Sequence, residues 1–129
     1  AFKGVDIIKP KKPLPSAYTL GFTKASVEDM PFKDKEYHVA VLAEILEHVD
    51  NPKNALSESG RIADRILIST PNEYNWSPNL SPFQNDKHVR YYRTDTIKKE
   101  IEDAGLSLIY FDIMNYGGWS FFMAVARQK

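Results

Sequence analysis

The sequence has no cysteine, no long apolar run and no excess of charge of either sign. Without cysteine, neither disulfides nor thiolate metal sites can form. No segment approaches the length of a membrane-spanning helix, and no charged-then-apolar signal opens the chain. The 17 basic and 17 acidic residues cancel, so charge gives no reason to expect nucleic acid or an anionic membrane as a partner. We therefore expect a cytoplasmic protein.

The 129 residues are enough for a single domain with a real core, but few for a doubly wound enzyme. The chain starts at Ala1 rather than at a methionine, directly before a strand-like segment, and we expect that it was cut from something longer. Alternating and continuous apolar patterns predict strands, and capping residues predict helices. The expected strands cover residues 2–8, 21–27, 39–43, 65–70, 106–115 and 120–126, and the expected helices follow Asn51-Pro52 and span 95–104.

The centre of the chain carries a recognisable series of short motifs. The first motif is an acidic turn with Met-Pro-Phe at Glu28–Phe32, and the second is the pair Tyr37-His38. An uninterrupted apolar run, Val39–Ala43, comes next. The last motif is Leu-Glu-His-Val-Asp-Asn-Pro at Leu46–Pro52. Their order and spacing closely resemble class I methyltransferases that use S-adenosylmethionine, in particular the type 11 group. The passages Ser69–Asn72, His88–Tyr92 and Ala104–Leu106 resemble later parts of the same family. An apolar run such as Val39–Ala43 is typical of a strand covered on both faces.

The resemblance implies an α/β fold: a Rossmann-like, mostly parallel sheet closed by a carboxyl-terminal antiparallel hairpin. The family begins with a strand, a helix and a Gly-x-Gly-x-Gly-like turn, and none of the six glycines forms such a turn. Residues 1–129 are therefore expected to be a single partial domain that lacks the first strand and helix. In family labels the strand order is then 3-2-(absent)-4-5-7-6. We expect the strands at Lys3–Ile7 and Val39–Ala43 to pair directly across the gap, with oligomerisation through their edges as the second possibility.

The resemblance also implies a cofactor, S-adenosylmethionine, and the residues around it. Asp6 stands where a family aspartate accepts the ribose hydroxyls, and Ser26, Val27, Glu28 and Asp29 form the turn on the adenine side. Glu47, His48, Asn72 and His88 are the candidates for contacting the methyl acceptor, whose identity the sequence does not give. No catalytic base is assigned. No metal site is expected, because His38, His48 and His88 share no ligand-like spacing.

Three departures from the family leave a second interpretation open. The glycine turn is absent, and Ser26 and His38 stand where the family has aspartates. The chain is therefore either a portion of an active methyltransferase or a degenerate, non-catalytic interaction module. A hydrolase that uses a histidine-bound metal is the third alternative. In the first two cases we expect the isolated chain to bind S-adenosylmethionine weakly or not at all. The aperiodic segment Pro71–Lys87 is expected to be a mobile lid, with Trp76 and Phe83 either walling an acceptor pocket or packed against the body.

Overall fold

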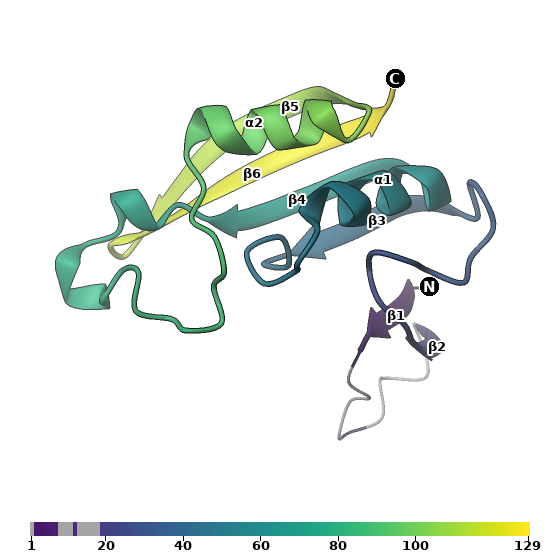
Figure 1. Cartoon of the computed structure of the whole chain (residues 1–129), viewed down its shortest axis with the longest axis horizontal. Coiled ribbons are helices and arrows are strands. Elements are labelled where there is room, and N and C mark those ends of the chain that lie inside the picture. Colours follow the sequence, from purple (N-terminus) through teal and green to yellow (C-terminus); the bar gives the residue numbers. More distant parts are fainter. Residues whose placement is uncertain (1, 8–11, 13–18) are drawn as a thin grey trace.

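The computed structural model describes residues 2–7, 12 and 19–129 (Figure 1). Residues 9–15, whose three prolines predict an extended link, lie outside this part except for Lys12. The main sheet has the order β3-β4-β6-β5, and the two helices cover one of its faces (Figure 1). Its elements are β3 (Tyr37–Ala43), α1 (Pro52–Ile62), β4 (Ala63–Pro71), the short helices η1 (Glu73–Asn75) and η2 (Pro78–Leu80), α2 (Thr94–Asp103), β5 (Leu106–Tyr116) and β6 (Trp119–Gln128).

Strand directions in the main sheet agree with the α/β prediction. β3 runs parallel to β4, β6 runs antiparallel to β4, and β5 and β6 form the predicted hairpin. The hairpin loop is Gly117-Gly118, with φ of 54° and 85°. A two-residue hairpin turn of this kind needs positive φ at both positions, which glycine adopts without a steric cost.

Helix α1 begins at the predicted cap, and Gly60 in its second half packs closely against the sheet. The Asn51 side chain accepts a hydrogen bond from the backbone N–H of Asn54 at 3.1 Å, and Pro52 fills the first turn. Gly60 weakens an isolated helix, but here it faces the sheet. A Cβ at this position would lie 2.7 Å from Cδ2 of Leu106, so the glycine allows α1 to approach β5.

The core lies between the helices and one face of the main sheet. Its fully buried members include Leu56 from α1, Ile66 from β4 and Ile97 from α2. The prediction that Val39–Ala43 is covered on both faces is wrong for this chain. Val39 and Val41 are 47% and 65% exposed, because among the described residues both helices pack on the opposite face.

A second, small sheet consists of β1 (Phe2–Asp6) and β2 (Thr19–Lys24), which run parallel. The strand order therefore follows the predicted series with its gap. The expected direct pairing across the gap is wrong: β1 hydrogen-bonds to β2 and β3 to β4, in two separate sheets. Side-chain packing, rather than backbone hydrogen bonds, connects β1 to the rest of the fold here, since Val5 contacts the buried cluster of Met30, Ile62 and Ala63.

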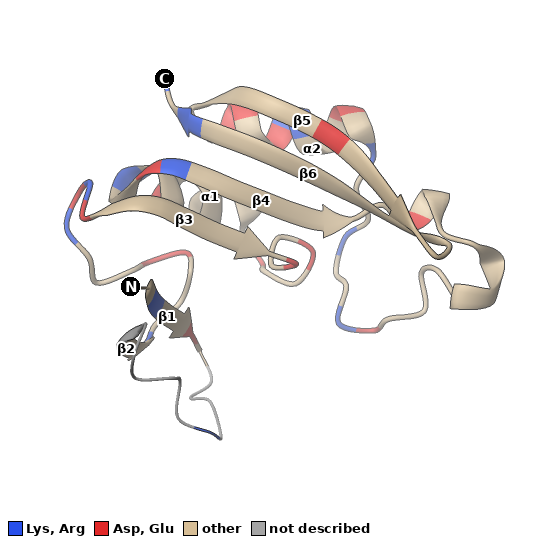
Figure 2. Cartoon of the chain, turned by 180° about the vertical axis from the view of Figure 1, so that it is seen from behind, with Lys and Arg blue, Asp and Glu red and all other residues tan. Residues whose placement is uncertain are grey.

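Charged residues of both signs are spread over the helices, loops and strands in the view from behind (Figure 2). This agrees with the balanced composition. Within the described residues, no helix combines the length and the apolarity needed to span a membrane.

Candidate functional site

The predicted nucleoside-binding residues lie next to one another at the end of the small sheet. Asp6 is the last residue of β1, and its carbonyl accepts a hydrogen bond from the N–H of Ala25 at 3.0 Å. This bond brings Asp6 beside the turn that starts at Ser26. Within the turn, Ser26 bridges to Asp29, and the Ser26 hydroxyl oxygen accepts from the N–H of Glu28 at 3.1 Å. Asp6, Ser26 and Asp29 are exposed.

One hydrogen bond connects this turn to the second group of predicted residues. Oε1 of Glu28 accepts from the backbone N–H of Asn51 at 2.9 Å. Asn51 caps α1 and follows directly on the segment with Glu47 and His48. The carboxylate of Glu28 thus holds the two halves of the candidate site together, a role that the sequence did not indicate because the partners are 23 residues apart.

A groove of about 820 Å³ lies between β1 and β3. β1, the turn, β3 and α1 all contribute to its largely apolar wall. Its lining residues are Phe2, Lys3, Val5, Val27, Met30, Phe32, residues 36–42, Ile45, Ser59 and Ile62. His38 belongs to this lining and stands apart from the other two histidines.

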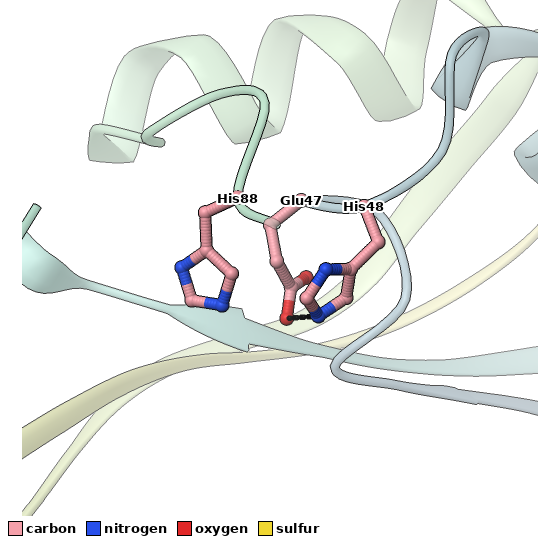
Figure 3. A group of neighbouring side chains, drawn as sticks. All are labelled: Glu47, His48 and His88. Carbon is pink, nitrogen blue, oxygen red and sulfur yellow. Dashed lines mark ion pairs between the residues drawn. The ribbon is translucent and has the colours of Figure 1, made fainter. Parts of the chain in front are cut away.

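The predicted acceptor contacts Glu47, His48 and His88 come together beyond the end of β3 (Figure 3). In open α/β sheets, ligands bind outside the carboxyl ends of the parallel strands. Glu47 is 2% exposed, and its Oε2 accepts from the Thr70 hydroxyl at 3.0 Å. Its Oε1 has no hydrogen-bond donor among the described residues, and Nε2 of His48 is 3.6 Å away.

His88 reaches this cluster from a distant part of the chain. The N–H of Val89 donates to the carbonyl of Glu47 at 2.8 Å, which fixes the two segments side by side. The rings of His48 and His88 meet edge to face, with centroids 4.8 Å apart. On its other side, Nδ1 of His88 contacts Oε1 of Glu73, a buried acid that no sequence pattern singled out.

Two further residues, Arg90 and Glu44, hold the segment after β3, and the sequence reasoning assigned no role to Arg90. Arg90 donates through its guanidinium to the carbonyls of Leu46 and Val49, both at 2.5 Å. Glu44 adopts φ of 53°, unusual for a residue other than glycine, and its Oε1 accepts from the Ser69 hydroxyl at 2.8 Å. Burial is the main cause that raises the pKa of Glu44, with Ser69 opposing it. Strained backbone and raised carboxyl pKa values are both frequent at functional sites.

The fourth predicted acceptor contact, Asn72, is buried and engaged elsewhere. Its amide donates to the hydroxyl of Ser120 at 3.1 Å. Trp76 also contacts β6, the strand that contains Ser120. Its indole N–H donates to the Ser120 carbonyl at 2.8 Å, and its ring packs edge to face on Trp119. Trp76 therefore packs on the hairpin, whereas Phe83 is 42% exposed.

These residues fit S-adenosylmethionine in part. Asp6 and the Ser26–Asp29 turn lie beside each other, as the prediction for the nucleoside end requires, and a carboxylate can accept two ribose hydroxyls. The methionine end of the cofactor normally needs a backbone that approaches it closely at a glycine-rich turn. The sequence contains no such turn.

A family profile and a named curated relative both indicate a methyltransferase domain. The sequence profile of the family described as "Methyltransferase domain" matches residues 2–110. A protein of Mycobacterium tuberculosis H37Rv named "probable S-adenosylmethionine-dependent methyltransferase" is 26% identical over 85 residues, covering 64% of this chain and 31% of the relative. An uncharacterised protein of Methanocaldococcus jannaschii is 34% identical over 62 residues, covering 48% and 30%. The matched segment thus spans about a third of these curated relatives.

Solved structures with the same fold include methyltransferases. The 1,6-didemethyltoxoflavin N1-methyltransferase of Burkholderia thailandensis, solved with bound 1,6-didemethyltoxoflavin and S-adenosylhomocysteine, superposes with a TM-score of 0.77 at 14% identity, covering 98% of this chain and 60% of that one. A methyltransferase of Methanosarcina mazei gives 0.68 at 13%, covering 98% and 81%. The family resemblance, the fold class and S-adenosylmethionine as the family's cofactor are thereby confirmed, whereas the type 11 assignment stays a prediction. The chain belongs to the methyltransferase domain family.

Proposed function

We propose that the chain is the portion of an S-adenosylmethionine-dependent methyltransferase that binds the nucleoside and the methyl acceptor. Asp6 and the Ser26–Asp29 turn face the nucleoside, and Glu47, His48 and His88 face the acceptor. The observation that carries this proposal is the 2.9 Å hydrogen bond from Asn51 to Glu28. It holds the nucleoside turn next to the segment that carries Glu47 and His48, as methyl transfer between two bound molecules requires.

The bound cofactor supplies an electrophilic methyl group, and the residues of this chain align the acceptor and receive its proton. The chemistry that the cofactor would supply is a methyl group bonded to a positively charged sulfur, which would keep the carbon–sulfur electron pair when the acceptor atom takes the methyl group. In this proposal Glu44 takes the proton, because it is half-buried, held by Ser69, and made more basic by burial. Asn72 is a positioning residue, because its amide donates to the Ser120 hydroxyl and so fixes the end of β4 to β6.

The direct test uses the full-length natural protein with S-adenosylmethionine labelled on its methyl group and a panel of hydroxyl, amine and carboxyl acceptors. Transfer of label, with a decrease of about 10²- to 10⁴-fold in kcat for Glu44→Gln, would support the proposal. The exposed Glu102→Gln on α2 is the matched control. Absence of transfer to every acceptor would favour the non-catalytic interaction module instead.

Three narrower points stay predictions. The isolated 129-residue chain should bind S-adenosylmethionine weakly or not at all, because it lacks the glycine turn. Calorimetric titration that gives a low-micromolar Kd would contradict this. The cytoplasmic location also remains a prediction, as does the methyl acceptor as the main partner.

A further inference from the structure

Glu47, His48 and His88 form a compact group of metal-ligand atoms that the sequence spacing concealed. One atom from each side chain, a carboxylate oxygen or a ring nitrogen, lies within 4.8 Å of the others. Ligands at about 2.0–2.2 Å around a tetrahedral zinc ion are separated by roughly 3.3–3.6 Å. Small side-chain rotations therefore suffice to close the group around an ion, and His48, which is 37% exposed, is free of tight packing on one side.

Hydrogen bonds on the far side of both rings set the tautomer that a metal needs. Nδ1 of His48 lies 2.9 Å from the carbonyl oxygen of Lys87, which can only accept, so this nitrogen carries the hydrogen. Nδ1 of His88 contacts the carboxylate of Glu73 in the same way. In the neutral rings the lone pairs are then on Nε2, on the sides that face Glu47 (Figure 3). Metal-bound histidines almost always donate their other N–H to a carbonyl or a carboxylate.

The third member of the group, Glu47, has a buried oxygen without a hydrogen-bond donor among the described residues. Glu47 is 2% exposed, Oε2 is bound by Thr70, and Oε1 is buried without a donor among the described residues. A buried carboxylate oxygen without a partner is costly, and native proteins rarely keep one without a reason. A divalent cation between Oε1 and the two Nε2 atoms satisfies it.

We propose that Glu47, His48 and His88 bind a zinc-type divalent metal ion. Two imidazoles and one carboxylate are a ligand set used by zinc, whereas magnesium and calcium prefer oxygen alone. Three protein ligands leave a coordination position open beyond the end of β3. Glu73 and the Lys87 carbonyl are positioning groups that orient the histidines, and the backbone bond from Val89 to Glu47 keeps both segments in register.

The competing arrangement is an imidazolium at His88 that bridges Glu73 and Glu47. It would satisfy Oε1 by a hydrogen bond and would bind no metal. Binding measurements separate the two arrangements without any assay of methyl transfer, so the metal site and the proposed function can fail independently.

The experiment is calorimetric titration of the chelator-treated 129-residue chain with zinc chloride, with bound metal counted by mass spectrometry. We expect about one zinc per chain and no uptake of magnesium. His48→Ala, His88→Ala and Glu47→Gln should each weaken binding at least about tenfold, and Glu73→Gln should weaken it less than removal of a ligand does. His38→Ala, which removes the third histidine of the chain, should bind as the parent does.

Cobalt(II) provides a second measurement that does not depend on comparing stabilities. Its visible spectrum should indicate a four-coordinate site with nitrogen and oxygen ligands in the parent and in His38→Ala, and this spectrum should be lost in His48→Ala, whose fold is checked by circular dichroism. Absence of zinc uptake by the parent would overturn the proposal. Equal weakening in His38→Ala and His48→Ala would also overturn it, since it would indicate adventitious binding to surface histidines.

Discussion

Glu47 offers a test in which stability and site chemistry oppose each other. Replacing it by glutamine keeps the shape of the side chain. It also keeps one oxygen that can accept the hydrogen bond of the Thr70 hydroxyl, which lies 3.0 Å from Oε2 in the parent. The buried Oε1, which has no donor among the described residues, becomes an amide N–H₂. This group can donate toward Nε2 of His48, 3.6 Å from the present oxygen. An unsatisfied buried acceptor costs about 1–3 kcal/mol, so Glu47→Gln should raise the free energy of unfolding by about that amount.

The assay is urea unfolding followed by circular dichroism at pH 8, with EDTA present so that metal binding does not contribute. Glu102→Gln, an exposed change on α2, should stay within about 0.5 kcal/mol of the parent. Glu47→Ala should be destabilised, because it leaves a cavity and removes the partner of Thr70. A Glu47→Gln variant no more stable than the parent would refute the reasoning that Oε1 is an unsatisfied group.

Three further predictions concern the scaffold. Gly60→Ala should lower the free energy of unfolding, measured by urea titration, by up to about 2 kcal/mol. The new Cβ would lie 2.7 Å from Cδ2 of Leu106, and this overpacking outweighs the gain in helix propensity of about 1 kcal/mol. A more stable variant would contradict this close approach. The hydrogen bond from Arg61 lowers the pKa of Glu58 in the folded protein below its ordinary value of 4.5. The ionised Glu58 therefore stabilises the fold above pH 4.5, and this stabilisation is lost as the pH falls through the pKa of Glu58 in the folded state. Acid unfolding of Glu58→Gln should accordingly be less steep below pH 4.5 than that of the parent, and identical profiles would exclude this linkage. In hydrogen exchange, the amides of Pro71–Lys87 should exchange faster than those of β3, and equal protection would contradict the lid assignment.

The sequence predicted the elements well where local signals were strong. Asn51-Pro52 started α1, and the Gly117-Gly118 pair joined the hairpin, since capping and turn geometry depend on a few neighbouring residues. The family motifs gave the fold class and the strand order with its gap. They did not show that β1 and β3 stay unpaired, because that depends on side-chain packing across the gap, where Val5 contacts the cluster of Met30 and Ile62.

Local sequence also determined which residue types were available at the site: two histidines, several glutamates and no thiolate. Only the tertiary structure decided which of them meet. His48 and His88 are brought together by the contact of Val89 with Glu47, and Glu73 reaches His88 from 15 residues away. Burial of Oε1 of Glu47 is likewise a property of the assembled fold. Residue spacing argued against a metal site because ligands on separate segments leave no short pattern, whereas folding sets their distances through backbone contacts that the pattern does not encode.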